Sequence, residues 1–432
     1  MNTNSAPLLS AVETRTAIAS GKITAEQATR DLLDRIDALE PTVEAWVAVD
    51  RQGALEAARA LDRGPDGGAL HGVGFGVKDI FAAKNLPWRC GSPIWADRIA
   101  DFDAASVAIA RAAGAIILGK TETTEFAGYK ASRTHNPAAP GRTPGGSSSG
   151  SAAAVSAGMA PLAFGTQTSG SVIRPASFCG VVGYKPSFDL IEPGGVSPLS
   201  RSLDTVGLFA RDVPDIVFAL QALTGLDFAL PQTARRPSRL GLFRSNAWHA
   251  AEADLVTAWE AFERDLEATG VALAETLPAP FVARLDGVMD LHARIMATEG
   301  SEALAHEAAI APHLLSPGLA DQLTEGRAMS AAQRHADRQA MTGLRAAAVA
   351  SLAADAVWLT PATCGAAPDW HSGTGNPAFN RTWSLLGLPA CSVPILADPH
   401  GRPIGVQIVG AMGNDAGVLA TANWLMDTFT AG

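Results

Sequence analysis

The stretch TPGGSSSGSAAAVSAGMAPLAFGTQTSGSVIRPASFCGVVGYKP, residues 143–186, contains two turns rich in glycine and serine. The first covers residues 145–151 and the second residues 168–171, and a run of small residues and an apolar segment lie between them. Glycine and serine leave backbone amides accessible, and each turn can present a hydroxyl group. The first turn runs directly into a helical pattern, whereas a flexible linker would be longer and more polar. We therefore interpret both turns as parts of the folded core.

A lysine that could serve these hydroxyls lies upstream. Residues 72–78 alternate between glycine and apolar side chains, which predicts a strand that ends at Lys78. Burial beside Val77, Ile80 and Phe81 would lower the pKa of Lys78, so that its neutral amine could act as a base for a serine nucleophile. The alternative is that the turns are packing corners and Lys78 is a surface lysine. Composition and spacing leave the two interpretations equally open.

Helical and strand patterns alternate along the rest of the chain. Capping and periodicity predict helices near residues 24–39, 52–61, 103–113, 151–155 and 254–268, and Ala-rich helices over 285–354. Short apolar runs predict strands near 115–118, 240–243, 271–275, 357–359, 390–394 and 405–409. This alternation is typical of an α/β layered fold with a largely parallel sheet. We find no internal repeat and no domain boundary.

Composition narrows the class of protein. The chain has 432 residues, of which 47% are hydrophobic and 18% charged, so it is too apolar for disorder. Its net charge of −10 argues against nucleic acid and anionic membranes as partners. Four widely spaced cysteines argue against a disulfide framework or a zinc site. Residues 1–7 lack the features of a signal peptide and no apolar stretch would span a bilayer, so we expect a cytoplasmic protein.

Two motifs point to other chemistries. Residues 114–121 match the phosphate-binding pattern G-x-x-x-x-G-K-[ST], but the four intervening residues, Ala-Ile-Ile-Leu, look like a strand rather than a polar loop. Residues 146–150 match the G-x-S-x-G nucleophile elbow with Ser148 at its centre, but no strand precedes them. The elbow would also need a histidine, and His292, His306 and His335 lie in ordinary helical contexts. We regard both motifs as coincidental.

Three separated blocks resemble the amidase signature family. Its hallmark is a Gly-Gly-Ser-Ser-Gly-Gly-like turn, a small-residue helix, and the patterns G-T-D-x-G-G-S-[I/V]-R and C-G-x-x-G-x-K-P. The chain matches these patterns at residues 145–148, 165–171 and 179–186, and the family lysine falls on Lys78. The resemblance covers most of the chain and implies one domain over residues 1–432, with a twisted mixed sheet flanked by helices on both sides. The signature core would span about 70–215, and substrate-shaping loops would lie within about 285–380.

The resemblance implies a catalytic triad of Ser171, Ser147 and Lys78. Ser171 would be the nucleophile, and Ser147, which would follow a cis peptide bond from Gly146, would relay the proton between Ser171 and Lys78. No cofactor and no metal would be needed. The oxyanion hole would consist of four consecutive backbone amides: Thr168, Ser169, Gly170 and Ser171.

The chain departs from the family pattern at three positions. Gln167 stands in place of the usual aspartate, Ser169 replaces a glycine, and Arg174 follows the nucleophile by three residues instead of two. This variant resembles the malonamidase-like branch, in which the arginine faces the substrate and can hold a carboxylate. In the alternative interpretation, Arg174 pairs with a nearby carboxylate of the protein and holds the loop. Both interpretations remain open.

We therefore expect a hydrolase of C–N bonds in small carboxamides or carbamates, of amidase or urethanase type, with a covalent acyl-serine intermediate. The alternatives are a malonamidase-like hydrolase of anionic amides and a glutaminase-type component of an amidotransferase, which would require partner proteins and tRNA. We favour neutral aryl substrates because Trp358, Trp370, Phe379 and Trp383 offer apolar surface. The expected partner is a small molecule, and the expected state is a monomer or homodimer. Besides Arg174, the candidate substrate-binding residues are Gly145, Gly146, Asn376 and Phe379.

Overall fold

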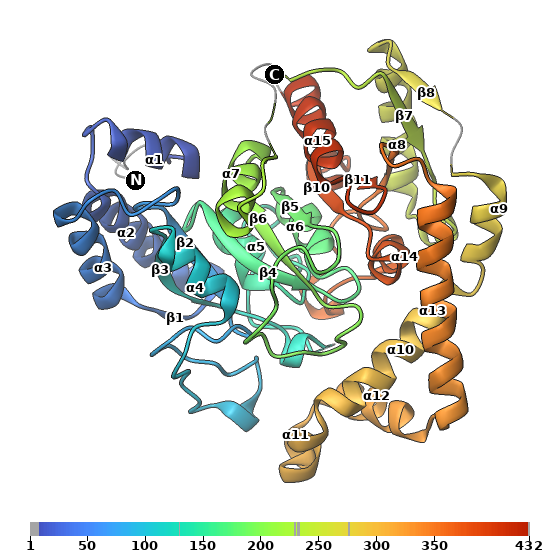
Figure 1. The fold of residues 1–432 in the computed structure, drawn as a ribbon, viewed down its shortest axis with the longest axis horizontal. Coiled ribbons are helices and arrows are strands. Elements are labelled where there is room, and N and C mark those ends of the chain that lie inside the picture. The colour runs from blue at the N-terminus through green and yellow to red at the C-terminus, as the bar shows by residue number, and fades with distance from the viewer. Residues whose placement is uncertain (1–7, 129, 229, 231–233, 275–276, 431–432) are drawn as a thin grey trace.

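The computed structural model describes residues 8–430 except 129, 229, 231–233 and 275–276. Within this part of the chain all strands belong to one sheet (Figure 1). The strands are β1 (Trp46–Val49), β2 (Gly74–Lys78), β3 (Ile116–Thr121), β4 (Leu162–Gln167), β5 (Val182–Lys185), β6 (Thr205–Ala210), β7 (Arg239–Leu242), β8 (Ala272–Ala274), β9 (Val357–Pro361), β10 (Ala390–Ala397) and β11 (Pro403–Gly410).

The sheet is mixed. Its order is β1-β3-β2-β4-β6-β5-β10-β11-β9-β7-β8. Strand β2 pairs in parallel with β3 and β4, and β7 pairs in parallel with β8 and β9, whereas the central strands from β4 to β9 pair antiparallel. The single α/β domain with a mixed sheet is thus confirmed, and the expectation of a largely parallel sheet is wrong. Apolar runs indicate that a strand is buried but not in which direction it runs, so they could not distinguish parallel from antiparallel pairing.

Helices cover both faces of the sheet (Figure 1). Those described are α1 (Ala11–Ala19), α2 (Ala25–Val43), α3 (Arg51–Arg63), α4 (Ala105–Ala112), α5 (Ser149–Ser156), α6 (Ile173–Cys179), α7 (Val213–Thr224), α8 (Ala253–Ala268), α9 (Ala279–Val282), α10 (Val288–Ala303), α11 (Ala305–Ile310), α12 (Pro317–Ala328), α13 (Ala331–Ser351), α14 (Ala378–Leu386) and α15 (Asp415–Phe429). No described helix is long and apolar enough to cross a bilayer.

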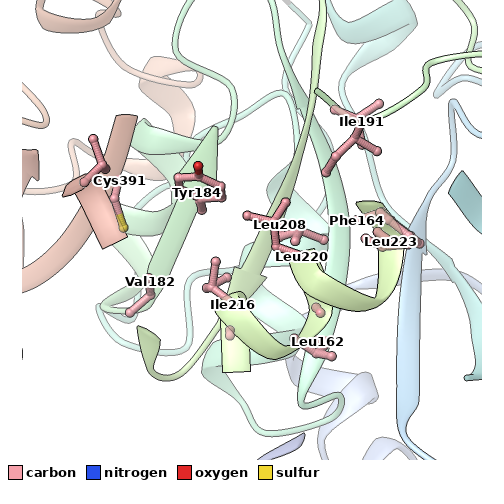
Figure 2. Close-up of a cluster of buried hydrophobic side chains, with 14 of the residues drawn as sticks. Leu162, Phe164, Val182, Tyr184, Ile191, Leu208, Ile216, Leu220, Leu223 and Cys391 are labelled. Atoms are coloured by element: carbon pink, nitrogen blue, oxygen red, sulfur yellow. The ribbon is translucent and has the colours of Figure 1, made fainter. Parts of the chain in front are cut away.

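Alternation along the central strands separates two cores. Leu162 and Phe164 of β4 join the core under α7 and α15, while Ala163 between them joins the core under α5 and α6. This is the period of two that a strand buried on both faces requires. Figure 2 shows part of the first core, in which Leu208 of β6 and Leu220 of α7 belong to the same buried cluster. The centre of the sheet is therefore buried on both faces, and it carries the signature segments.

The phosphate-binding pattern is part of a strand, as predicted. Its lysine, Lys120, lies in β3 and is fully buried. The Lys120 Nζ atom donates hydrogen bonds to Asp79 Oδ1 at 3.0 Å and to the carbonyl oxygens of Phe81 at 2.7 Å and Pro87 at 2.6 Å. All three ammonium donors are used inside the protein, so Lys120 holds together the segment that follows β2.

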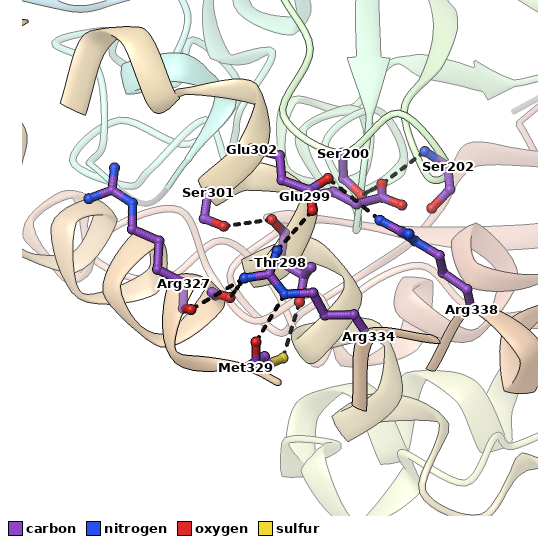
Figure 3. Close-up of polar contacts among 11 residues, drawn as sticks. Ser200, Ser202, Thr298, Glu299, Ser301, Glu302, Arg327, Met329, Arg334 and Arg338 are labelled. Carbon is purple, nitrogen blue, oxygen red and sulfur yellow. Dashed lines mark hydrogen bonds and ion pairs between the residues drawn. The ribbon is translucent and has the colours of Figure 1, made fainter. Parts of the chain in front are cut away.

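The Ala-rich region forms helices α10 to α13, which extend away from the sheet (Figure 1). Polar contacts fasten α10 to the segment before β6, because Glu299 accepts hydrogen bonds from Ser200 Oγ at 2.6 Å and Ser202 N at 3.0 Å. Arg334 of α13 pairs with Glu302 of α10 at 2.9 Å (Figure 3). These contacts hold α10 against the signature core.

Candidate active site

Strand β2 delivers Lys78 into the protein interior. Lys78 is fully buried, and its Nζ atom lies 2.7 Å from Ser147 Oγ and 2.9 Å from Thr166 Oγ1. Burial lowers the pKa of Lys78 to about 7. The expectation of a surface lysine is therefore wrong. The peptide bond between Gly146 and Ser147 is cis, as predicted.

Ser171 lies on the wall of a small cavity. The cavity is also lined by Thr168, Ser169 and Arg174. Among the described residues, the Ser171 hydroxyl makes no hydrogen bond to Ser147, although both side chains are almost completely buried. The structure thus places Lys78 and Ser147 in direct contact, while Ser171 lines a cavity that a substrate could enter.

The loop 168–171 is held by its carbonyl groups. The oxygen of Thr168 accepts from His292 Nε2 at 3.0 Å, that of Ser169 from Ser384 Oγ at 2.7 Å, and that of Gly170 from the amide of residue 174 at 2.9 Å. In a trans peptide the N–H of the next residue points opposite to the carbonyl. The amides of residues 169–171 are therefore turned away from these anchors.

Gln167 replaces the family aspartate as a support for the loop. Its Oε1 accepts from the amides of Val172 at 2.9 Å and Ile173 at 3.0 Å, and its Nε2 lies 3.1 Å from Ser384 Oγ. The amide side chain thus both caps the start of α6 and orients the serine that holds Ser169. A carboxylate could accept these bonds but could not donate to Ser384.

Asp204, at the start of β6, was not identified from the sequence. Its carboxylate accepts from Thr168 Oγ1 at 2.5 Å and from the amides of Leu199 and Ser200 at 2.8 and 2.9 Å. Burial raises its pKa to about 6, and its negative charge favours the protonated form of Lys78. Asp204 therefore both supports the loop before Ser171 and influences the pKa of Lys78. Its only sequence signal is an acidic residue before an apolar run.

His292 lies in a helix, as its sequence context indicates, but the contact of its side chain with the loop 168–171 was not identified from the sequence. It is fully buried on α10, and burial lowers its pKa to about 4. Since the carbonyl of Thr168 can only accept, the Nε2 atom of the neutral ring carries the proton. A helical histidine gives no local signal that a loop from elsewhere in the chain will pack on it.

Arg174 extends from the first turn of α6 into the same cavity. It is 5% exposed, and its Nη2 atom donates to the carbonyl of Gly146 at 2.7 Å and lies 3.2 Å from Thr374 Oγ1. The alternative in which Arg174 pairs with a protein carboxylate is not realised among the described residues. Gly146 therefore contributes a carbonyl that positions Arg174, while Gly145 packs against Pro175 and Phe178.

The structure does not bring the other predicted pocket residues to the cavity. Asn376 Oδ1 accepts from the amide of Ala378 at 3.0 Å and so supports the start of α14. Phe379 is buried and packs edge to face on Trp248. The expected aromatic surface is likewise elsewhere: Trp358 and Trp383 pack on each other in the core, and Trp370 stacks on His135.

The nucleophile-elbow interpretation of Ser148 finds no support. Its side chain is fully buried, and its Oγ atom donates to the carbonyl of Thr166 at 3.3 Å, at the point where α5 begins. In the part of the chain that the structure describes, no group of three or more His, Cys, Asp or Glu side chains is placed to hold a metal ion.

The site thus combines a buried lysine in contact with a cis-linked serine, and a second serine on the wall of a cavity. The profile of the Amidase family matches residues 27–419, and the chain belongs to that family. A solved structure described as a crystal structure of amidase superposes with a TM-score of 0.87 at 30% identity and covers 98% of this chain and 100% of its own.

Other relatives differ in what their names say. Peptide amidase from Stenotrophomonas maltophilia superposes with a TM-score of 0.83 at 25% identity, covering 98% of each chain. A glutamyl-tRNA(Gln) amidotransferase component from Acidothermus cellulolyticus is 44% identical over 227 residues, which are 50% of this chain and 45% of the relative. Its counterpart in Aromatoleum aromaticum is 37% identical over 66% of this chain and 59% of its own length. The chain thus spans about half the length of the curated relatives it matches.

Proposed function

We propose that this chain hydrolyses the C–N bond of a small carboxamide or carbamate through an acyl intermediate on Ser171, without a cofactor. The observation that carries the proposal is the contact between Lys78 and Ser147, 2.7 Å apart, with a lysine pKa near 7. A lysine with this pKa is about half neutral at pH 7 and can accept a proton, whereas an ordinary lysine is almost entirely protonated at that pH.

In the first half-reaction, Ser171 Oγ attacks the carbonyl carbon while its proton passes to Ser147, whose own proton passes to Lys78. The negative charge that develops on the carbonyl oxygen is stabilised by the amides of the loop 168–171. This role is supported by the hydrogen-bonded carbonyls of residues 168–170, since the amides that follow them are turned away from those anchors. When the tetrahedral intermediate collapses, the C–N bond breaks. Lys78 returns its proton through Ser147 to the departing nitrogen, which leaves as a neutral amine.

In the second half-reaction, water attacks the acyl-Ser171 ester and loses a proton along the same route. The ester C–O bond between the acyl carbon and Ser171 Oγ then breaks, Ser171 recovers its proton, and the product leaves as a carboxylic acid or, from a carbamate, as a carbonic acid monoester. The same three side chains therefore serve both halves, with Lys78 alternating between base and acid. Each side chain ends the cycle in its starting protonation state.

A second candidate is the glutaminase component of an amidotransferase, because curated relatives of 37–44% identity are named as components of glutamyl-tRNA(Gln) amidotransferase. Glutamine has an α-ammonium as well as an α-carboxylate. The described residues that line the cavity include Arg174 and Arg381 but no aspartate or glutamate that would pair with an ammonium. This composition favours the free-standing amidase.

The test uses the purified chain alone with a primary amide, an anilide, a carbamate, a urea, an ester and glutamine, and measures amine or ammonia release. We expect turnover of an amide or carbamate, unaffected by a chelator, and no turnover by Ser171→Ala. Glutamine hydrolysis that appears only with the other amidotransferase components and tRNA would support the second candidate. Activity that is lost with a chelator and restored by a metal would contradict the cofactor-free mechanism.

A further inference from the structure

Two arginines from distant parts of the chain line the cavity beside Ser171. Arg174 comes from α6, and Arg381 comes from α14. The loop residues Thr168 and Ser169 line the same space. The cavity therefore combines the candidate nucleophile and its oxyanion loop with two guanidinium groups.

Both guanidinium groups have buried donors without an acceptor. The Nε and Nη1 atoms of Arg174 and the Nε atom of Arg381 are buried and have no hydrogen-bond partner in the structure. Neither arginine forms an ion pair within the part of the chain that the structure describes. A buried donor that lacks an acceptor destabilises the folded protein, and a ligand that enters the cavity could supply the acceptors that these groups lack.

The charges of the two arginines act on each other. Burial, together with the positive charge of Arg381, lowers the pKa of Arg174 to about 10. The described residues that line the cavity carry no carboxylate that would offset this repulsion. An anion that enters the cavity would relieve both the repulsion and the unsatisfied donors.

We propose that Arg381 is a second specificity-determining residue, which together with Arg174 binds the carboxylate of an amide substrate. The inference rests on the proposed hydrolysis at Ser171 and names its substrate class as small amides that carry a carboxylate. A guanidinium donates strong charge-assisted hydrogen bonds to a carboxylate, and the Nε and Nη1 atoms of Arg174 have no acceptor among the described residues. The neutral aryl substrates expected from the sequence lose their support, because the aromatic side chains lie elsewhere.

The substrate test compares amides that differ in charge but hardly in shape. Malonamate and succinamate carry a carboxylate, malonamide and succinamide replace it with a neutral amide, and β-alaninamide carries an ammonium. We expect the wild-type chain to have the highest kcat/KM with one of the two anionic amides and the lowest with the cation. Equal or better hydrolysis of the neutral amides would overturn the proposal.

Substitutions test whether the preference for anionic amides depends on Arg381. Arg381→Gln and Arg174→Gln should each lower kcat/KM for the anionic amide by roughly thirty-fold or more, because a buried charge-assisted pair is lost. The neutral diamides should change by only a few-fold. Arg264→Gln, at an exposed position of α8, is the matched control and should leave all rates unchanged. If Arg381→Gln lowers kcat/KM equally for the anionic and the neutral amides, or for neither, the proposed role of Arg381 is contradicted.

A binding measurement separates this inference from the proposed hydrolysis. The Ser171→Ala chain should bind malonate or succinate in a calorimetric titration, and adding Arg381→Gln should weaken that binding by a similar factor. Melting temperatures check that each variant is folded. Binding that depends on Arg381 without any amide turnover in the wild type would contradict the hydrolysis but support the anion site. Turnover without such binding would overturn the anion site alone.

Discussion

The Nε2 atom of His292 donates a hydrogen bond to the carbonyl oxygen of Thr168 across 3.0 Å, and so joins α10 to the loop that precedes Ser171. Because the ring is neutral and its Nε2 carries the proton, this bond persists over the physiological pH range. The helix of the Ala-rich region therefore takes part in setting the direction of the loop amides. His292 is a positioning residue in the proposed mechanism.

Replacing His292 should slow the chemical step more than it weakens substrate binding. We expect His292→Leu to reduce kcat by about ten-fold or more, less than the 10²–10³ measured when an oxyanion donor itself is removed, with little change in KM. His292→Gln keeps an N–H donor and should lose less. Steady-state kinetics, with melting temperatures as a check on folding, test this expectation. A rise in KM at constant kcat would assign His292 to substrate binding instead.

The nucleophile can be located by covalent labelling. A phosphonate or sulfonyl fluoride should modify Ser171, as mapped by peptide mass spectrometry, and Ser171→Ala should lose at least about a thousand-fold in kcat. Ser148→Ala is the matched control in the neighbouring Gly/Ser turn. It removes two buried hydrogen bonds between Ser148 Oγ and the backbone of Thr166, each worth about 1 kcal/mol of stability, and should retain most activity. Label on Ser148 would contradict the assignment.

The pH profile should report the lysine. With a Lys78 pKa near 7, kcat/KM should rise about ten-fold per pH unit below pH 7 and level off above it, because only the neutral amine accepts a proton. Lys78→Arg keeps the charge but cannot lose its proton, and it should lose roughly 10²-fold or more at every pH up to 9. Lys78→Arg activity near that of the wild type would exclude a proton-accepting role.

Asp204 should influence the pH at which kcat/KM rises. Its negative charge favours the protonated lysine, so Asp204→Asn should lower the pKa of Lys78. The rising limb of kcat/KM should then move to lower pH, by roughly 0.5–1 unit. Asparagine can still accept the hydrogen bond from Thr168, which keeps part of the loop support. A limb that stays in place or moves to higher pH would contradict the coupling between the two groups.

The buried pair of Lys120 and Asp79 predicts a stability effect without nucleotide binding. Lys120→Met leaves the Asp79 carboxylate buried without its partner and should lower the free energy of unfolding by about 3–5 kcal/mol. Lys84→Met, at an exposed lysine, is the control and should stay close to wild type. Denaturant titrations measure both. ATP should not raise the melting temperature of the wild type or of either variant. A stabilising effect of ATP on the wild type would support the phosphate-binding interpretation instead.

Local patterns were sufficient for much of the fold. The predicted helices near 52–61 and 254–268 correspond to α3 and α8, and the strand ending at Lys78 is β2. The cap predicted at Thr24 is present on α2, where its side chain accepts from the amide of Gln27 at 3.0 Å. The predicted strand 271–275 corresponds to β8, although residue 275 lies outside the described part of the chain. Such features depend on neighbours a few positions apart, which the sequence gives directly.

The sequence by itself determined the element pattern, the two Gly/Ser turns and the lysine at a strand end. Tertiary structure decided the direction of the central strands, the burial that lowers the pKa of Lys78, and the meeting of Asp204, His292 and Arg381 around Ser171. It also placed Trp358 and Trp383 in the core instead of the pocket. The physical reason is that periodicity reports which face of an element is apolar. Which distant segment covers that face, and with what charge, depends on how the whole chain packs.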